Sequence, residues 1–410
     1  MHPLPVPETP PKKPVKKHFK KVGKGLLIAG GVFTLLFVGW AYGQGRLSLH
    51  GFGAAKSKQV VHSLDYSSLD EVYQLLQKNY DGKLDNNAVL DGLKAGLARS
   101  TGDPYTEYFN PEQAKDFDEG LSGSFTGIGA ELGKDKDSIV IISPISGFPA
   151  EKAGLKPKDV IVAIDGQTVN DISISDAVKR IRGPKDTKVK LKVARDGKLI
   201  EFEITRDNIN IPSVKSEIIN GNIGYMRISR FSEDTAQLAQ QGADQFKQAN
   251  VKGIILDVRG DPGGLLNSAV DVASLWLPQG KTVLSERRDG IIVRNYQATG
   301  GDILAGFPTV VLVDDGSASA SEIVAGALKD NGAATLIGVK TYGKGSVQQV
   351  ERLPGGAMLK VTIARWYTPG GRNIDKQGIE PDKAVKLSDD DIKAQRDTQK
   401  EAAIQSLKQQ

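Results

Sequence analysis

The feature that most constrains the fold is an alternation of short β-branched runs with amphipathic segments between about residues 208 and 387. The strand-like runs include "GIILDVRG" and "TVVLV", and helical patterns such as "EDTAQLAQQGADQFKQAN" separate them. Strands that alternate with helices of this length are typical of α/β proteins built from crossover units. We therefore expect an α/β core in this part of the chain.

The residues before this core show two further patterns. Between residues 119 and 207, short strand-like runs such as "DVIVAIDG" and "KVKLKVARDG" accompany one helical run, so we expect a β-rich domain. Between residues 63 and 118 the pattern is helical. Its apolar side chains recur three or four residues apart and predict two packing faces, formed by Val72, Leu75 and Leu76 in one helix and by Val89, Leu90, Leu93 and Leu97 in the next.

The N-terminus is typical of a membrane anchor. Residues 1–24 contain seven lysines and one glutamate, and residues 25–45 form an uncharged, mostly apolar run. About 20 such residues are enough to cross the hydrocarbon core of a bilayer. Because the lysines precede this run, the positive-inside rule keeps the N-terminus cytoplasmic and places the following chain outside the cell membrane. The alternative is a cleaved signal peptide, although the apolar run is longer than is usual for one.

Composition excludes several kinds of function. The seven lysines of residues 1–24 exceed the net charge of +5 of the whole chain, so the remainder is close to neutral and we do not expect nucleic acid as a partner. The chain has no cysteine, and its four histidines all lie before residue 63. A Ser-His-Asp triad, a thiol nucleophile and a histidine-ligated metal are therefore excluded from the body of the protein. We expect neither a metal nor another cofactor.

The stretch "DDGSASASEIVAGALKD", residues 314–330, places three serines two apart where a strand-like run passes into a helix. Ser319 and Glu322 have the S-x-x-E spacing of a capping box, in which the glutamate reaches back to the serine. The start of a helix also favours negative charge, because backbone N–H groups point outward there. Ser319 therefore suits a helix cap or a nucleophile, and the two roles are compatible.

A serine nucleophile without histidine needs a carboxylate or a lysine as its base, and a lysine serves only when desolvation holds it neutral. Lys329 lies about 15 Å from Ser319 along the same helix, which is too far. Lys340 ends a predicted strand, and Lys360 alternates with apolar neighbours as an outward-facing strand residue would. Lys344 lies in a G-K-G turn, where flanking glycines permit a tight bend that aims the ammonium into a site.

The β-rich segment resembles a PDZ domain. The resemblance rests on "FTGIGAEL" at residues 125–132, on "SGFPAEKAGLKPKDVIVAIDGQTV" and on "RDGKLIEFEI". In such domains a glycine-rich loop binds the terminal carboxylate of a peptide, and the strand after it accepts the peptide by β-augmentation. The resemblance implies that Gly127, Ile128, Gly129 and Ala130 form this carboxylate-binding loop.

A larger resemblance covers most of residues 63–387. The run "GSASASEIVAGALKDNGAATLIGVKTYGKGSVQ", with "LDVRGDPGGLL" before it and "GIEPDKAV" after it, resembles the carboxyl-terminal processing proteases, which join a PDZ domain to a serine-lysine peptidase core of crotonase-like α/β fold. The implied roles are a nucleophile (Ser319), a general base (Lys344), a residue that positions the lysine (Gln348), oxyanion-hole amides (Ala320 with Gly263 or Gly264), serines that shape the turn (Ser317 and Ser321) and supporting carboxylates (Asp330 and Glu322).

The sequence departs from the family pattern at one place, and two alternative functions remain open. Asp314 and Asp315 stand where the family commonly has an asparagine, and carboxylates there would raise the pKa of a neighbouring lysine. One alternative is a catalytically inactive PDZ adaptor that presents client proteins to another enzyme. The other is a crotonase-like acyl hydrolase, for which a PDZ domain has no use. The sequence does not determine the oligomeric state or the physiological substrates.

We therefore expect a single-pass membrane protein whose catalytic body lies outside the cell membrane and cleaves proteins with accessible, apolar C-termini. The expected parts are a basic cytoplasmic tail (1–24), a transmembrane helix (25–45), a linker (46–62), an N-terminal helical segment (63–118), an inserted PDZ domain (119–207), the peptidase core (208–387) and a charged C-terminal segment (388–410), which is either a docking helix or a solvated tail.

Overall fold

The computed structural model describes residues 65–169 and 172–409, and the chain divides after Lys83 into two units. The described part of the first unit contains one helix, α2 (Ser67–Asn79). The predicted packing face of this helix, with Val72, Leu75 and Leu76, is exposed. The predicted tail, transmembrane helix and linker lie outside the described residues. Within the described part of the chain, no helix has the length and apolar character needed to cross a bilayer.

The second unit begins with α3 (Asn86–Arg99), β1 (Glu107–Phe109) and α4 (Pro111–Ser122). Helix α3 packs through small residues, Ala95 and Ala98, against Tyr108 of β1. The predicted packing face of α3 was therefore wrong, because Leu90, Leu93 and Leu97 are exposed. Alanine lets the helix backbone approach the tyrosine ring more closely than leucine would. Between the helices of this segment, β1 pairs with β18 (Met358–Tyr367).

The β-rich domain is a sheet in the order β3-β4-β5-β7-β8, antiparallel throughout. Its edge strand β3 lies beside the loop that contains the predicted carboxylate-binding residues. Alternate side chains of β7 are buried, which gives this domain a hydrophobic core of its own. The elements are β2 (Ser124–Gly127), β3 (Ala130–Asp135), β4 (Ser138–Pro144), α5 (Pro149–Ala153), β5 (Val160–Ile164), β6 (Gln167–Thr168), α6 (Ile174–Ile181), β7 (Lys188–Arg195), β8 (Lys198–Thr205) and β9 (Asp207–Asn210).

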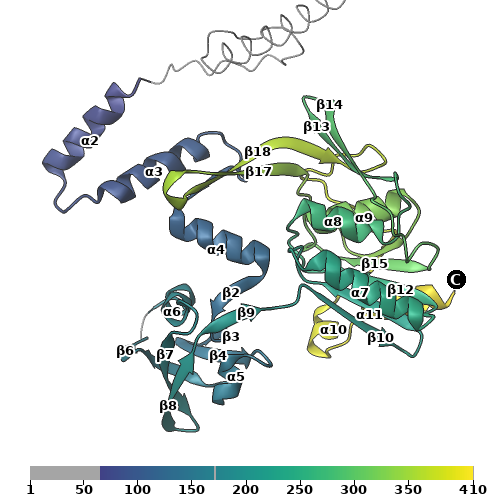
Figure 1. Cartoon of the computed structure of the whole chain (residues 1–410), viewed down its shortest axis with the longest axis horizontal. Helices are drawn as coiled ribbons and strands as arrows, with labels where there is room; N and C mark the ends of the chain where they lie inside the picture. The colour runs from purple at the N-terminus through teal and green to yellow at the C-terminus, as the bar shows by residue number, and fades with distance from the viewer. Residues whose placement is uncertain (1–64, 170–171, 410) are drawn as a thin grey trace, which may run out of the picture. The chain divides into compact units, whose positions relative to one another are not determined.

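The α/β core expected from the sequence is confirmed. Its sheet has the order β10-β11-β12-β15-β16-β19, in which all pairs are parallel except β10 with β11. Helices α7, α8 and α9 lie against one face of the sheet, and Figure 1 shows α8 beside α9. The elements are β10 (Val214–Ile219), β11 (Ile223–Ile228), α7 (Thr235–Gln248), β12 (Gly253–Asp257), α8 (Leu266–Ser274), β15 (Thr309–Val313), α9 (Ala320–Asp330), β16 (Thr335–Gly338) and β19 (Lys383–Ala384).

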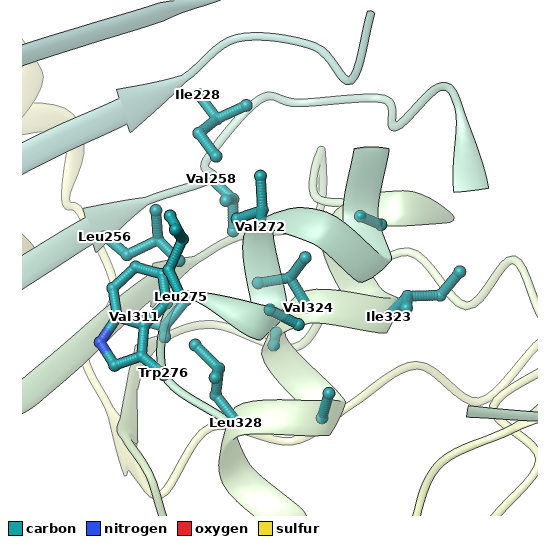
Figure 2. Packing of buried hydrophobic residues seen from close by; sticks show 14 of the residues in the cluster. Ile228, Leu256, Val258, Val272, Leu275, Trp276, Val311, Ile323, Val324 and Leu328 are labelled. Carbon is teal, nitrogen blue, oxygen red and sulfur yellow. The ribbon is translucent and has the colours of Figure 1, made fainter. Parts of the chain in front are cut away.

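The central strands are buried on both faces, as their continuous apolar runs predict. Leu256 and Val311 point toward α8 and α9, where they pack with Val272 and Val324 (Figure 2). Their sequence neighbours point to the opposite face, which α11 (Thr398–Lys408) covers. This two-sided burial fixes where β12 and β15 end, and therefore where the loops that follow them begin.

The C-terminal segment is a docking helix rather than a solvated tail. Residues 389–393 form a short helix, α10 (Asp389–Lys393), and α11 then buries Ala403 and Leu407, which are four residues apart and share one helix face. Arg259, at the end of β12, holds the start of α11 through ion pairs to Asp257 at 2.7 Å and to Asp397 at 2.8 Å. The sequence left the docking helix and the solvated tail open, and this buried apolar stripe decides for the helix.

A second, antiparallel sheet completes the core. It has the order β1-β18-β13-β14, and β17 also pairs with β18. Its remaining elements are β13 (Thr282–Arg288), β14 (Ile291–Gln297), β17 (Ser346–Arg352) and the short helix η1 (Pro354–Gly356). The loop between β16 and β17 contains Lys344, so the two sheets meet at the predicted base.

Candidate active site

The predicted nucleophile lies at the carboxyl end of a parallel strand, which is where ligand sites form in α/β sheets. Strand β15 ends at Val313, a tight turn follows, and α9 begins at Ala320. Ser319 occupies the position before the helix with φ +55° and ψ −111°. Such a conformation costs a residue with a Cβ atom on the order of 1–3 kcal/mol and persists only where surrounding contacts enforce it. The turn therefore stores strain at Ser319.

The two neighbouring serines enforce this turn. The Ser317 hydroxyl donates to the Val258 carbonyl at 2.8 Å and accepts from the Asp314 amide at 3.0 Å. The Ser321 hydroxyl donates to the Asp261 carbonyl at 3.0 Å. Both hydroxyl-bearing side chains are fully buried, whereas Ser319 is partly exposed. Of the three serines, only the middle one is open to a substrate.

Glu322 ties the turn to the loop that carries the predicted base. Its fully buried carboxylate accepts four hydrogen bonds, two on each oxygen. Oε2 accepts from the amides of Ser319 and Lys344, each at 2.9 Å. Oε1 accepts from the Thr341 hydroxyl at 2.5 Å and from the Gly343 amide at 2.8 Å. Burial raises the pKa of Glu322, and these donors oppose that effect. The predicted bond from glutamate back to serine is thus present and belongs to a larger network.

Lys344 is held in a largely apolar setting. Trp366 donates its indole N–H to the Lys344 carbonyl at 2.9 Å, and the Lys344 Nζ lies 5.3 Å from the centre of the Tyr105 ring. Burial lowers the pKa of Lys344, and the positive charge of Lys360 lowers it further, whereas Glu322 acts in the opposite direction. A base needs this lowered pKa because only the neutral amine can accept a proton.

One cavity of about 510 Å³ brings together the predicted catalytic residues and the two candidate oxyanion glycines, whereas Ala320 is not among its lining residues. Ser319, Lys344 and Gln348 line it with Gly263 and Gly264. In the described part of the chain, no hydrogen bond joins the Ser319 and Lys344 side chains. The Gln348 side-chain amide donates to Ser346 Oγ at 2.7 Å rather than to the lysine.

The loop of residues 261–264 approaches the nucleophile through its glycines. A Cβ atom on Gly263 would lie 2.8 Å from both the Ser319 Cβ and the Ala320 nitrogen, so only glycine fits there. The Gly263 N–H donates to Asp261 Oδ1 at 2.8 Å. Among the described residues, the N–H groups of Gly264 and Ala320 have no hydrogen-bond acceptor. Of the two glycines, only Gly264 therefore keeps an unengaged backbone N–H among the described residues.

Lys360 differs from its expected placement. Its side chain was predicted to face outward, but it lines the same cavity and is mostly buried. Its Nζ lies 3.2 Å from Glu107 Oε2 and 4.9 Å from the centre of the Phe109 ring. Alternation along β18 correctly separates the two faces of the strand, but it does not reveal that Phe117 of α4 lies against the face with the lysine or that β1 pairs beside it. Arg230 and Phe117 also line the cavity without any signal in the sequence.

Asp330 and Asp314 do not line this cavity. Asp330 lies at the far end of α9, where it pairs with Arg372 at 2.7 Å and accepts from the Gly370 amide at 2.8 Å. Asp314 accepts hydrogen bonds from the backbone amides of Gly260 and Gly316. We expected Asp314 to raise the pKa of Lys344. The influences on this pKa come instead from burial, Lys360 and Glu322, and the net effect lowers it.

A separate cavity of about 150 Å³ lies in the β-rich domain. The predicted carboxylate-binding residues, Gly127 to Ala130, line it together with Val178 of α6 and Arg182. The Arg182 guanidinium lies 4.5 Å from the centre of the Phe125 ring and pairs with Glu119 at 3.0 Å. The cavity thus offers apolar walls, one cation and the free edge of β3.

Metal ligation has no candidate in the part of the chain that the structure describes, because no three histidine, cysteine, aspartate or glutamate side chains gather there in a suitable group.

Comparisons with known proteins agree with this architecture. The model of peptidase family S41 matches residues 222–385, and the PDZ domain model matches residues 116–194. The chain is 40% identical over 326 residues to the carboxy-terminal processing protease CtpA of Bacillus subtilis (strain 168), which covers 79% of this chain and 70% of that protein. A "Probable CtpA-like serine protease" of Staphylococcus aureus (strain COL) is 37% identical over 324 residues, which covers 78% of this chain and 64% of the relative.

A solved structure of a photosystem II D1 C-terminal processing protease is also similar, with 31% sequence identity and a TM-score of 0.49. The similarity covers 79% of this chain and 87% of that one.

Proposed function

Because this chain belongs to the carboxy-terminal processing proteases of peptidase family S41, we propose that it is a membrane-anchored endopeptidase in which Ser319 and Lys344 cleave proteins selected by their C-terminal ends. The observation that carries the assignment of the two residues is the double acceptance by Glu322 Oε2 of the Ser319 and Lys344 amides. One buried carboxylate thereby holds the backbone of both residues beside one cavity.

Acylation begins when the neutral Lys344 amine accepts the proton of Ser319 Oγ while Oγ bonds to the carbonyl carbon of the scissile peptide. The carbonyl oxygen becomes an oxyanion, which the N–H groups of Gly264 and Ala320 stabilise. As the peptide C–N bond breaks, the Lys344 ammonium returns the proton to the leaving amine. The proton transfer requires the flexible Lys344 side chain to rotate toward Ser319 Oγ. Such a rearrangement is expected, because catalytic hydrogen bonds often form only when the substrate is bound.

Deacylation repeats the sequence with water. Neutral Lys344 accepts a proton from a water molecule as that water attacks the ester carbonyl. The ester C–O bond breaks, and the lysine ammonium returns the proton to Ser319 Oγ. The partly apolar cavity, lined by Phe117, Phe231 and Trp366, keeps the lysine desolvated in both steps.

Substrate choice is assigned to the PDZ cavity. A peptide strand added to the free edge of β3 places its terminal carboxylate at the loop of residues 127–130. Ile128, Leu132 and Val178 supply an apolar environment for the last side chain. These features support a preference for free, apolar C-termini.

The cell-surface location rests on the sequence of residues 1–45, in which lysines precede an apolar run. Protease added outside intact cells should cut within the linker of residues 46–62 and release the body, while an N-terminal epitope stays protected. Protection of the body instead would contradict this orientation.

The test of the catalytic proposal uses the full-length protein in detergent and an unfolded substrate protein with an apolar C-terminus. Ser319→Ala and Lys344→Ala should each abolish cleavage, with the melting temperature retained. Lys329→Ala is the matched control, because Lys329 bonds to the Glu380 carbonyl at 2.8 Å and does not line the cavity. Cleavage by Lys344→Ala at the wild-type rate would show that another group is the base.

A further inference from the structure

The loop that carries one of the two proposed oxyanion amides, that of Gly264, is built around a fully buried acidic residue, Asp261. Its backbone carbonyl accepts from the Ala318 amide and from the Ser321 hydroxyl, each at 3.0 Å. Its Oδ1 accepts from the Gly263 amide at 2.8 Å. Asp261 therefore attaches the glycine loop to the turn that carries Ser319 and also occupies the N–H of one of the two glycines.

The second carboxyl oxygen of Asp261, Oδ2, is buried and has no hydrogen-bond partner. The nearby guanidinium groups donate to other acceptors, and the Arg230 Nε is a buried donor that is itself without a partner. On β11, Arg227 donates to Asp257 Oδ2 at 3.2 Å, and beyond that strand Arg230 donates to the Ile211 carbonyl. Neither guanidinium donates to Asp261. A buried, ionised oxygen without a partner is costly, and protonation removes that cost.

The titratable groups around Asp261 come from three sides. Arg227 and Arg230 are on the β11 side and lower its pKa through their charge. Helix α9 contributes Ser321 and, next to it, the buried Glu322, while Lys344 lies across the cavity. Burial is the largest influence and raises the pKa of Asp261 to about 7.

We propose that Asp261 is a positioning residue that directs the oxyanion to the Gly264 and Ala320 amides and that supports peptide cleavage in its neutral form. This inference rests on the proposed serine-lysine mechanism. An ionised Asp261, held against the Gly263 amide in the loop that also supplies the Gly264 amide, would oppose the negative charge that develops at the neighbouring oxyanion in a site of low polarity. A neutral carboxyl group still accepts the Gly263 N–H through its carbonyl oxygen, so protonation preserves the loop while removing the repulsion.

The consequence is a pair of opposing titrations. Rising pH deprotonates Lys344, which accelerates cleavage, and it also ionises Asp261, which slows it. The rate of the wild-type protein should therefore stop rising soon above pH 7. In Asp261→Asn the side chain stays neutral at every pH and keeps an acceptor for Gly263. In the limit of an inactive ionised form, the ratio of Asp261→Asn to wild-type kcat grows about tenfold per pH unit above 7.

The experiment measures kcat and KM from pH 6 to 10 with full-length wild type, Asp261→Asn and Asp261→Ala. We expect the kcat ratio of Asp261→Asn to wild type to increase with pH at unchanged KM. Asp261→Ala should have a low kcat at all pH values, because the glycine loop loses its acceptor. Glu380→Gln, which changes an exposed carboxylate outside the cavity, is the control for a general charge effect and should leave the profile unchanged.

Parallel pH profiles of wild type and Asp261→Asn would overturn the inference. A wild-type kcat that still rises tenfold per pH unit above pH 8 would also overturn the inference, and this measurement does not depend on the folding of an Asp261 variant. Cleavage that survives in Ser319→Ala would instead contradict the proposed function, so the two failures are distinguishable.

Discussion

The carboxylate of Glu322 accepts a hydrogen bond from the backbone N–H of Lys344 at 2.9 Å, across a separation of 22 residues in the chain. The helix that begins at the nucleophile thereby holds the loop that carries the base. Both oxygens of the Glu322 carboxylate accept hydrogen bonds. The network therefore requires a side chain that has two acceptor oxygens and no donor group. This dependence leads to the first prediction.

Glu322→Gln should impair activity although it preserves shape. The new amide NH₂ group would face two of the four donors that Glu322 accepts, which leaves buried N–H or O–H groups unsatisfied at about 1–3 kcal/mol each. We expect kcat to fall at least tenfold and urea unfolding to show a loss of a few kcal/mol. The control, Glu380→Gln, changes an exposed carboxylate and should be neutral within about 0.5 kcal/mol. Wild-type kcat in Glu322→Gln would mean that the network does not position the site.

Lys360→Met should shift the pH profile of cleavage. The charge of Lys360 lowers the pKa of Lys344, so its removal raises that pKa. Because only neutral Lys344 acts as the base, the rising limb of kcat against pH should move to higher pH, and the rate at pH 7 should fall. Lys360→Arg retains the charge and should retain the profile. A shift to lower pH would contradict the proximity of the two lysines. Lys340→Met removes an exposed lysine and serves as the control.

Gly263→Ala should displace the loop that faces the oxyanion. The added Cβ would lie 2.6 Å from the Ala318 carbonyl oxygen, and φ at Gly263 is +97°. Loss of one oxyanion donor typically lowers kcat by about 10²–10³. Gly260→Ala is a matched control, because that residue also has a positive φ, +64°, but its Cβ meets nothing within 4 Å. Steady-state kinetics should show a large loss in the first variant and little change in the second. Equal losses would indicate that backbone strain alone is responsible.

Gly129→Ala should abolish the preference for a free C-terminus. At φ +72°, the added Cβ would lie 2.5 Å from the Phe148 Cβ, which forces the carboxylate-binding loop to move. Rates on paired substrates with free and amidated C-termini should become equal. Gly147→Ala provides the same unfavourable φ, +82°, without a contact within 4 Å, and should keep the preference. If Gly129→Ala still prefers substrates with a free C-terminus, the terminal carboxylate is bound at a site other than the loop of residues 127–130.

The sequence predicted the α/β core and the β-rich domain because hydrophobic periodicity is a local property. The run "TVVLV" is apolar after its first residue, Thr309, because β15 is buried on both faces, and the alternation in β7 reflects a one-sided core. The same local pattern misled at α3, where leucines at helical spacing remain exposed and alanines make the contact. Periodicity identifies a face of a helix but does not identify its partner.

For the candidate site, the sequence by itself determined the residue types. The absence of histidine after residue 62 excluded a classical triad, and the resemblance to the carboxyl-terminal processing proteases implied Ser319 and Lys344 as nucleophile and base. Only the tertiary structure decided that Lys360 lies in the same cavity, that Asp330 lies at the far end of α9, and that Asp261 occupies the Gly263 amide. These relationships depend on burial and on contacts between segments far apart in the chain. Desolvation, which lowers the pKa of Lys344 and raises that of Asp261, exists only once those segments pack together.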